Sequence, residues 1–351
     1  MRCLMKNNVG YGRESSQLIQ AAHRMKNTPL CDALKTIFTC YFFHKTEEIL
    51  ASRKDPLPSY RRLLLQSRLY LQATLFFNDT FSRAQNHYSK SLEKITGEHY
   101  GNLFKQFDKP SYFEEPFRLL KIRLVRNGFD FQYPKGKTAL DAGCGGGRYT
   151  VALKRLGFSK VVGVDFSKEG IRDAECRVRL LGSNRVAFKR ADVLHLPYPE
   201  GSFDFVFSNG VLHHTKDMGL GIRELLRVLK KGGRGFIYLI ESPGGIFWDS
   251  LETLREVMRG VPSDLARKVM NELGVKANRI FYILDHILVP INILSTPQQV
   301  KSMLEKAGAV NIRRLTRGAD FDRVEKIFQG TPYHRIKFGV GENRFFFEKG
   351  S

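Results

Sequence analysis

The sequence predicts an α/β fold in which helices flank both faces of a mostly parallel sheet. Between residues 138 and 242, short apolar segments alternate with segments whose apolar residues recur at helical spacing. Glycines follow the first apolar segment and close several of the helical ones. Strands that alternate with helices at this spacing are typical of parallel sheets, in which each helix carries the chain back to start a new strand.

Each element of this region has its own signal. Apolar runs that end at an acid, an asparagine or a glycine predict strands, and amphipathic stretches that end near a glycine predict helices. Ser167 is the expected N-cap of the second helix, because a serine side chain accepts hydrogen bonds from first-turn amides. The expected strands are 138–143, 161–165, 186–192, 203–210 and 235–242, and the expected helices are 148–157, 168–182 and 218–233.

Segments on both sides of this region read as mostly helical. Residues 1–95 carry no chemical motif, although 60–75 is amphipathic and the aromatic run 36–43 suits either a core helix or a surface-seeking one. Residues 243–296 break the alternation. Further elements are a helix at 114–126, a helix at 295–308, a strand at 310–316 and one or two late strands within 336–349.

Composition describes an ordinary globular protein with a basic surface. The 351 residues are 42% hydrophobic and carry a net charge of +22, which permits a polyanionic partner such as nucleic acid or an anionic membrane. The Lys and Arg residues are scattered, which favours a simple solvated surface. Five cysteines without a CxxC pair predict neither a disulfide framework nor a zinc site.

No segment reads as a secretory signal or a membrane span. The N-terminal residues lack the apolar central segment that a secretory signal requires. The most apolar stretch, 281–294, is interrupted by Asp285 and His286 and is shorter than the roughly 20 residues that a spanning helix needs. We therefore expect a cytoplasmic, reducing setting and no transmembrane segment.

The segment ALDAGCGGGRYT, residues 139–150, carries the sharpest signal. Gly143, Gly145, Gly146 and Gly147 lie between an expected strand and an expected helix. Glycine is needed where the backbone turns at positive φ or where a ligand must approach the main chain without a Cβ in the way. A glycine-rich turn after the first strand of an α/β sheet predicts a nucleotide-type site.

The spacing of the glycines argues against a dinucleotide. That fingerprint requires a third glycine at the position of Arg148, which disfavours a nicotinamide-dependent reductase. Asp141 would also repel a pyrophosphate. A carboxylate here instead suits a ligand with a positively charged ammonium group, such as the amino-acid part of S-adenosylmethionine.

Two further acids follow at the ends of the next strands. Asp165 lies about 20 residues beyond the glycines, where a carboxylate can accept hydrogen bonds from both ribose hydroxyls. Asp192 is placed to accept from the exocyclic amine of an adenine, with Val193 and Leu194 flanking the ring. The fourth strand then delivers residues 208–215 to the reacting end of such a ligand.

Residues of roughly 137–243 resemble the class I S-adenosylmethionine-dependent methyltransferases. More narrowly, they are similar to the small-molecule group that includes the ubiquinone/menaquinone, sterol and tocopherol methyltransferases. The family often has a proline where this chain has Lys231, a departure that is harmless in a helix-end turn. The resemblance is carried by DAGCGGG (141–147), VVGVDFS (161–167), residues 191–214 and RELLRVLKKGG (223–233).

The resemblance implies a Rossmann-like, doubly wound sheet of seven strands whose last strand is antiparallel. It implies a methyltransferase domain over 135–351 with S-adenosylmethionine as its cofactor and no metal. The implied parts are a helical extension of unknown role (1–95), a helical cap over the cofactor site (96–134), a core (137–243), a helical substrate lid (244–296) and C-terminal helix and strands (297–351).

The resemblance also implies the cofactor residues. Tyr100 is expected by analogy to close over the methionine end, the alternative being an ordinary aromatic core residue. Cys144 is explained by its small size, and we do not expect a nucleophile there. The full expected set is Asp141, Gly143, Cys144, Gly145, Gly147, Asp165, Phe166, Asp192, Val193, Asn209 and Tyr100.

The implied chemistry is an in-line displacement at a sulfonium methyl group, for which positioning supplies much of the rate. A general base helps only where the acceptor must lose a proton. His213 and His214 are the candidates for that base, and a structural role is the alternative for both. Glu241 and Ser242, at the end of the fifth strand, either touch the substrate or form part of the surface.

The acceptor is expected to be a small hydrophobic molecule, with its oxygen, carbon or nitrogen nucleophile left open. This expectation rests on the apolar side chains of the insert, which alternatively pack the insert's own core. They are Phe247, Trp248, Phe281, Tyr282, Ile283, Ile287 and Leu288.

Two other functions remain open. A nucleic-acid methyltransferase would suit the net charge, but the Asp/Asn-Pro-Pro-aromatic tetrad usual in base-amine methyltransferases is replaced here by SNGV at 208–211. A non-catalytic S-adenosylmethionine-binding regulatory subunit would also keep the three aspartates. Residues 1–95 are equally open to a protein partner, an anionic membrane or a role in capping the sheet.

Overall fold

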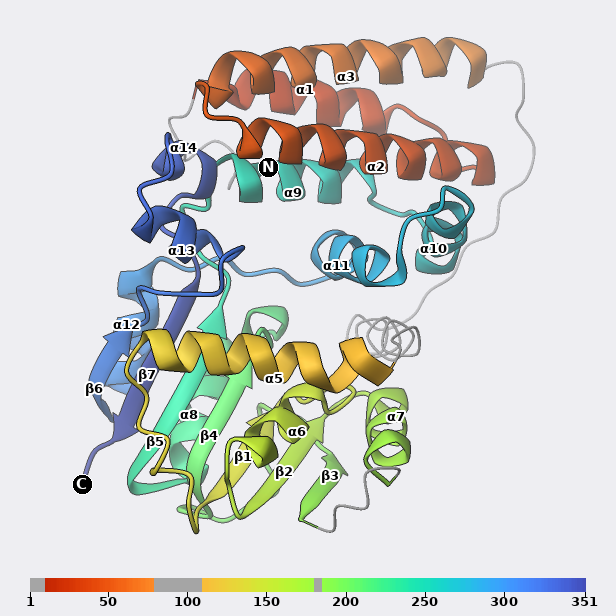
Figure 1. The fold of residues 1–351 in the computed structure, drawn as a ribbon. Coiled ribbons are helices and arrows are strands. Elements are labelled where there is room, and N and C mark those ends of the chain that lie inside the picture. Colours follow the sequence, from red (N-terminus) through yellow and green to blue (C-terminus); the bar gives the residue numbers. More distant parts are fainter. Residues whose placement is uncertain (1–9, 79–108, 180–184) are drawn as a thin grey trace. The chain divides into compact units, whose positions relative to one another are not determined.

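The computed structural model describes residues 10–78, 109–179 and 185–351 (Figure 1). The chain forms two compact units, each assembled from separate segments. One unit comprises Met1–Lys90, Pro243–Val289 and Gly330–Val340, and the other comprises Ser91–Ser242, Pro290–Gln329 and Gly341–Ser351.

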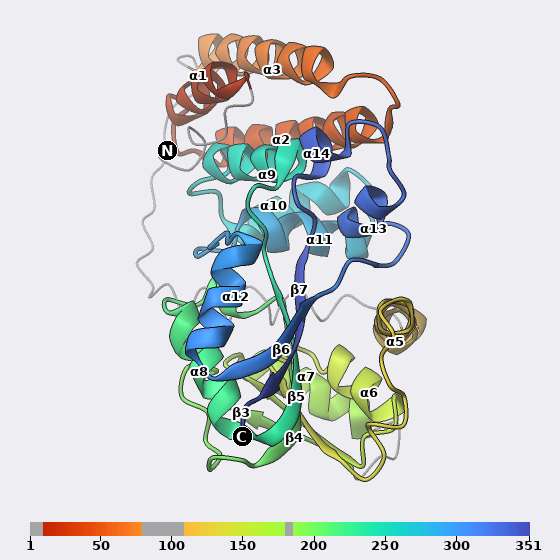
Figure 2. The same ribbon diagram turned by 90° about the vertical axis from the view of Figure 1, so that its left-hand side faces the viewer.

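The second unit is built on a seven-stranded sheet with the order β3-β2-β1-β4-β5-β7-β6. The first five strands run parallel, and β7 runs antiparallel to both of its neighbours (Figures 1 and 2). The predicted Rossmann-like fold class is therefore confirmed, including its antiparallel last strand. The strands are β1 (Thr138–Ala142), β2 (Lys160–Asp165), β3 (Val186–Arg190), β4 (Phe203–Asn209), β5 (Leu229–Leu239), β6 (Ala309–Arg314) and β7 (Asn343–Lys349).

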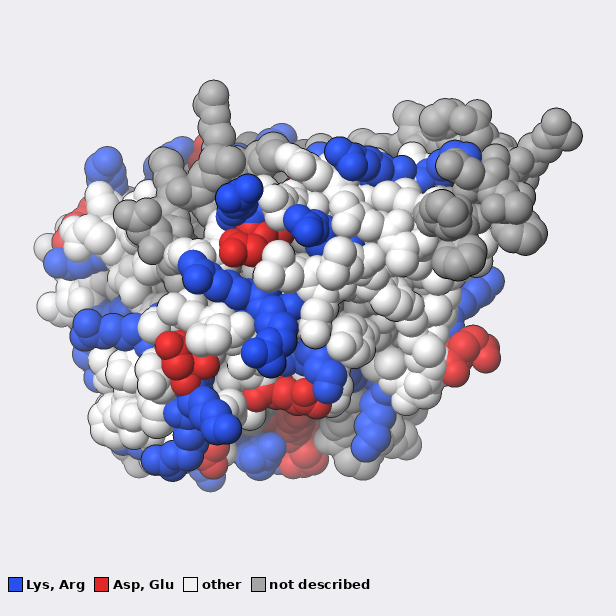
Figure 3. All heavy atoms as spheres, turned by 90° about the horizontal axis from the view of Figure 1, so that it is seen from above, with Lys and Arg blue, Asp and Glu red and all other residues white. Residues whose placement is uncertain are grey.

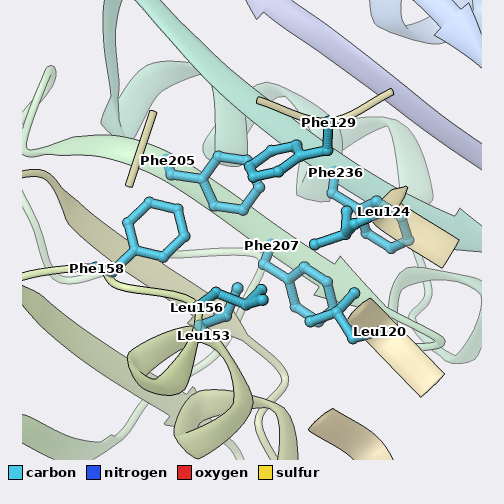
Figure 4. Close-up of a pocket in the computed structure, with 9 residues that line it drawn as sticks. All are labelled: Leu120, Leu124, Phe129, Leu153, Leu156, Phe158, Phe205, Phe207 and Phe236. Atoms are coloured by element: carbon cyan, nitrogen blue, oxygen red, sulfur yellow. The ribbon is translucent and has the colours of Figure 1, made fainter. Parts of the chain in front are cut away.

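Helices cover both faces of this sheet. One core cluster joins the strands to α8 (Met218–Val228) and α12 (Pro297–Lys306). The other joins them to α5 (Lys109–Arg126) and α6 (Arg148–Arg155), and Figure 4 shows its wholly apolar lining around a small internal cavity. The unit is completed by α7 (Lys168–Arg179), the short 3-10 helix η1 (Leu212–His214) and α13 (Arg323–Phe328).

Several element boundaries differ from the expectations, and three of these differences change how a segment is interpreted. Strand β3 ends at Arg190, so Asp192 lies in the following turn. Helix α8 ends at Val228, and Lys231 lies within β5 rather than in a helix-end turn, because Leu229 pairs with Phe203 of β4. Strand pairing thus overrides the helical preference of the lysines. The late segment forms the short helix α14 (His334–Phe338) before a single strand.

The first unit is helical, which confirms the predicted N-terminal helices and the predicted helical insert. Both sets pack into one body: Tyr60 and Ser250, from different segments, share a buried hydrogen bond of 3.0 Å. The run 36–43 has one buried and one exposed side: its phenylalanines lie in the core, while Ile37 and Tyr41 are exposed. The helices are α1 (Gly12–His23), α2 (Pro29–Ala51), α3 (Pro56–Asn78), α9 (Gly245–Val257), α10 (Ser263–Glu272), α11 (Ala277–Ile287) and α14.

A buried ionic cluster ties α5, α13 and β7 together in the sheet unit. Asp322 accepts two hydrogen bonds of 2.7 Å from Arg123 and two of 3.1 and 3.3 Å from Arg344. All three side chains are almost completely buried. The two guanidinium groups hold the pKa of Asp322 well below its usual range, although burial alone would raise that pKa.

Replacing Asp322 with alanine should lower the free energy of unfolding of the sheet unit by about 3–5 kcal/mol, because two buried arginines would lose their common carboxylate. Asp320→Ala is the control, since the Asp320 side chain is 81% exposed on the same loop. It should change that free energy by less than about 0.5 kcal/mol. Equal urea midpoints for the two variants would contradict this account.

Candidate active site

The glycine turn after β1 adopts the backbone that the sequence predicts. Gly143, Gly145 and Gly147 have φ values of 86°, 50° and 79°. A Cβ on Gly143 would lie 2.3 Å from the Val211 side chain, and one on Gly147 would lie 2.7 Å from Phe188. Conformation and space therefore both require glycine at the first and last of these positions.

Asp165 fastens this turn to the end of β2. Its two carboxylate oxygens accept 2.8 Å hydrogen bonds from the backbone N–H groups of Gly145 and Ser167. Burial raises the pKa of Asp165, and these backbone donors oppose the rise. Each carboxylate oxygen has a second lone pair, so both retain the capacity to accept from a ligand hydroxyl.

Asp141 lies at the end of β1 and is 1% exposed. It accepts a 2.6 Å hydrogen bond from the hydroxyl of Thr150 in α6. Burial raises the pKa of Asp141 to about 7; the Thr150 hydroxyl opposes this rise and the charge of Asp165 adds to it. A positive charge nearby would favour the ionised form of Asp141, so a cationic ligand would lower its pKa.

Cys144 is buried inside the same turn. Burial, together with the charges of Asp165 and Asp141, raises the pKa of its thiol well above the ordinary value. A thiol under these conditions stays protonated. The expectation that Cys144 is not a nucleophile therefore fits its surroundings.

Asp192 lies two residues beyond β3 with its side chain 43% exposed. One of its oxygens accepts a 2.8 Å bond from the N–H of Leu194, which fixes the carboxylate in the turn. Val193 and Leu194 are buried beside it. Phe166, which follows Asp165, is exposed and carries the Arg190 guanidinium over its ring at 5.4 Å.

The two histidines after β4 have different hydrogen-bond partners. The Ile240 N–H donates to Nδ1 of His213 at 3.3 Å, so the proton of neutral His213 lies on Nε2. Nδ1 of His214 lies 2.8 Å from the Ile291 carbonyl and must donate to it. In the neutral rings, the unprotonated nitrogen is therefore Nε2 in His214 and Nδ1 in His213. Asn209 ends β4 on the same sheet edge as the glycine turn.

Glu241 is completely buried, which rules out the surface carboxylate considered from the sequence. It follows β5 and accepts a 2.6 Å hydrogen bond from Arg323. Ser242, next in the chain, donates its N–H to the carbonyl of Ser295. The carboxyl edge of β5 is thus a buried polar patch in which Arg323 neutralises Glu241.

Tyr112, which no sequence motif singles out, contacts the glycine turn. It lies in α5, is fully buried and donates its hydroxyl hydrogen bond to the Gly146 carbonyl in the glycine turn. Arg177 lies over its ring at 4.0 Å. No spacing rule connects a tyrosine 34 positions earlier to the turn. Tyr100, the aromatic that was chosen, lies outside the described residues.

The apolar side chains of the insert belong to the helical unit. Phe247, Trp248, Ile283 and Ile287 are all buried there, as packing of a core would require. The side chain of Phe281 lies outside the described part of the chain. Two roles stay predictions: that of residues 244–296 as a substrate lid and that of residues 96–134 as a cofactor cap.

Of the helices that the structure describes, none combines the length and the apolar character needed to cross a bilayer.

Comparisons with known proteins agree with this geometry. Residues 140–237 match the family model described as a methyltransferase domain. The 27-O-demethylrifamycin SV methyltransferase of Amycolatopsis mediterranei is 38% identical over 130 residues, covering 36% of this chain and 47% of that protein. The demethylmenaquinone methyltransferase of Geobacillus stearothermophilus is 37% identical over 28% of this chain and 43% of its own length.

The chain thus spans less than half the length of these curated relatives. Among solved structures, an S-adenosylmethionine-dependent methyltransferase from Aquifex aeolicus aligns with a TM-score of 0.41 and 18% identity. That alignment covers 71% of this chain and 96% of the other.

Proposed function

We propose that this chain, whose residues 140–237 form a class I S-adenosylmethionine-dependent methyltransferase domain, transfers a methyl group to a small hydrophobic acceptor. The observation that carries the proposal is the glycine turn held by Asp165, with Asp141 buried behind it and Asp192 beside it. A turn guarded by carboxylates suits a zwitterionic sulfonium nucleoside and repels a pyrophosphate.

Each acid has a distinct part in this proposal. Asp165 would hold the ribose through the second lone pairs of its oxygens, while its backbone bonds keep the turn in shape. Asp141 would supply negative charge near the ammonium group. Asp192, Val193 and Phe166 would surround the adenine, and Tyr112 would keep the turn closed from the side of α5.

The acceptor that fits best is one that loses a proton when it is methylated, such as a phenolic hydroxyl or an activated ring carbon. His214 supports this reading, because its Nδ1 donates to the Ile291 carbonyl and the neutral ring therefore carries its basic lone pair on Nε2. Bound S-adenosylmethionine would supply the methyl group and would leave as S-adenosylhomocysteine, and His214 would accept the proton that the acceptor loses. The names of the relatives, a demethylrifamycin and a demethylmenaquinone methyltransferase, point to the same class of acceptor.

Binding without turnover is the second candidate, since the three aspartates serve binding alone equally well. A regulatory subunit would bind S-adenosylmethionine yet form no S-adenosylhomocysteine with any acceptor. A nucleic-acid methyltransferase has less support, because the described site offers Asn209, Gly210 and Val211 where base-amine enzymes carry prolines and an aromatic residue.

The purified chain should form S-adenosylhomocysteine with at least one member of a panel of naphthoquinols and phenolic polyketides. Asp165→Ala should abolish both this product and the thermal stabilisation by added S-adenosylhomocysteine, because the turn would lose its tie and the ribose its acceptor. Glu169→Ala, an exposed acid four residues later, is the control and should keep both. Undiminished ligand binding by Asp165→Ala would overturn the assignment.

Affinity for S-adenosylhomocysteine should rise roughly tenfold between pH 6 and pH 8. The pKa of Asp141 is about 7 in the free protein, and a bound ammonium group lowers it. Only the ionised carboxylate attracts the ligand, so affinity increases as pH rises through 7 and then levels off. Calorimetry on Asp141→Asn should give weaker binding without this slope; the same slope in that variant would contradict the assignment.

His214→Asn should lower kcat by about 10²- to 10⁴-fold with a hydroxyl acceptor, because a general base contributes that much. The asparagine amide can still donate to the Ile291 carbonyl, so the loop should keep its shape. His213→Asn tests specificity, because Nδ1 of His213 already accepts from the Ile240 N–H: it should lower kcat less than His214→Asn does. Normal turnover by His214→Asn would remove the base from the mechanism.

A further inference from the structure

Helix α3 exposes apolar side chains on the face that the helical unit does not use. Tyr60, Leu63, Leu64 and Leu71 of α3 are buried. On the outward side, Leu65, Leu69 and Tyr70 remain 41%, 57% and 53% exposed. Leu65 and Leu69 are four residues apart and therefore lie on one stripe of the helix. The fold thus leaves an apolar stripe in water, which indicates contact with something else.

The same helix is basic and carries no acid. It contains Arg61, Arg62 and Arg68 and has neither Asp nor Glu between Pro56 and Asn78. Arg61 donates to the Gly10 carbonyl and Arg68 to the amide of Gln17, both neutral partners that leave the positive charges uncompensated.

Arg62 lies on the exposed side three residues before Leu65 and has no hydrogen-bond or ion-pair partner among the residues that the structure describes. The turn before the helix adds Arg53 and Lys54, both exposed, and one exposed acid, Asp55, which accepts from the Leu57 N–H. Figure 3, which looks down on this part of the molecule, shows Lys and Arg side chains together with some Asp and Glu side chains and many uncharged ones.

Tyrosines lie beside the apolar stripe. Tyr70 stacks on Phe38 of α2 with ring centroids 6.5 Å apart, and α2 exposes Ile37 and Tyr41. Tyrosine has an apolar ring and a polar hydroxyl, and it is enriched at the boundary between lipid and water. Exposed leucines beside an arginine and tyrosines are side chains that suit the boundary between lipid and water.

We propose that α3 docks the protein on an anionic membrane surface, with Leu65 and Leu69 entering the acyl boundary and Arg62 meeting lipid phosphates. Nucleic acid would use the arginines but would leave two exposed leucines without a role. The charge of the helix matches anionic headgroups, each basic residue near such a surface adding to the attraction. The proposal concerns a surface distinct from the methyl-transfer site and stands independently of it.

Sedimentation of the full chain with lipid vesicles tests this inference. Wild-type protein should bind vesicles of phosphatidylcholine with one third phosphatidylglycerol, and bind phosphatidylcholine alone at least tenfold more weakly. Leu65→Ser with Leu69→Ser should weaken binding about tenfold or more, and Arg62→Gln about fivefold. These side chains are exposed, so the variants should keep the wild-type melting temperature.

The matched control is Val310→Ser with Lys306→Gln, which removes an exposed apolar side chain and an exposed charge from the sheet unit. It should bind vesicles like the wild type. Failure of the wild type to bind anionic vesicles, or full binding by the leucine variant, would overturn the proposal. So would RNA competing for a site that depends on Arg62 but not on the leucines. Methyl transfer to a soluble acceptor is measured separately, so either proposal can fail alone.

Discussion

The hydrogen bonds from the backbone of Gly145 and Ser167 to the Asp165 carboxylate hold the candidate site together. They join the end of β2 to the turn after β1, which has left the sheet and adopts positive φ at three glycines. Without this carboxylate the turn would keep its steric limits but lose its tie to the neighbouring strand. The same carboxylate has lone pairs to spare, so one side chain can both shape the turn and receive a ligand. This double use explains why an acid is suited to the end of β2.

Buried acids in the sheet unit fall into two kinds that their partners distinguish. Asp322 lies between two arginines, and its pKa is lowered despite burial. Asp141 has only the Thr150 hydroxyl and the like charge of Asp165 near it, so burial raises its pKa to about 7. Removing one partner from a buried ion pair is costly, and a buried carboxylate without a cationic partner is stabilised in its charged form when a cation binds beside it. This contrast supports the proposal that Asp141, rather than the more extensively bonded Asp322, takes part in ligand binding.

The sequence predicted features that depend on local pattern and missed those that depend on distant contacts. Alternating periodicity was sufficient to predict a mostly parallel sheet with helices on both faces, and glycine spacing was sufficient to predict the turn at Gly143. Lys231 was placed in a helix end because the amphipathic stretch 218–233 ends at two glycines, but Leu229 pairs with Phe203 and draws this segment into β5. Tyr112 reaches Gly146 only through the packing of α5, which no spacing shows. The hydrogen-bond partners that distinguish His213 from His214 likewise come from distant parts of the chain, Ile240 just after β5 and Ile291.

The helical unit shows how two segments without motifs become one body. The N-terminal helices and the insert after β5 pack against each other, and Trp248 and Tyr60 are fully buried in the unit that combines them. Most apolar side chains of the insert are buried in the core of the helical unit. They are therefore weaker evidence for a hydrophobic acceptor than the sequence alone suggested. The apolar side chains that stay exposed on this unit are more informative. Leu65 and Leu69 remain 41% and 57% exposed beside Arg62, and this exposure supports the proposed membrane contact.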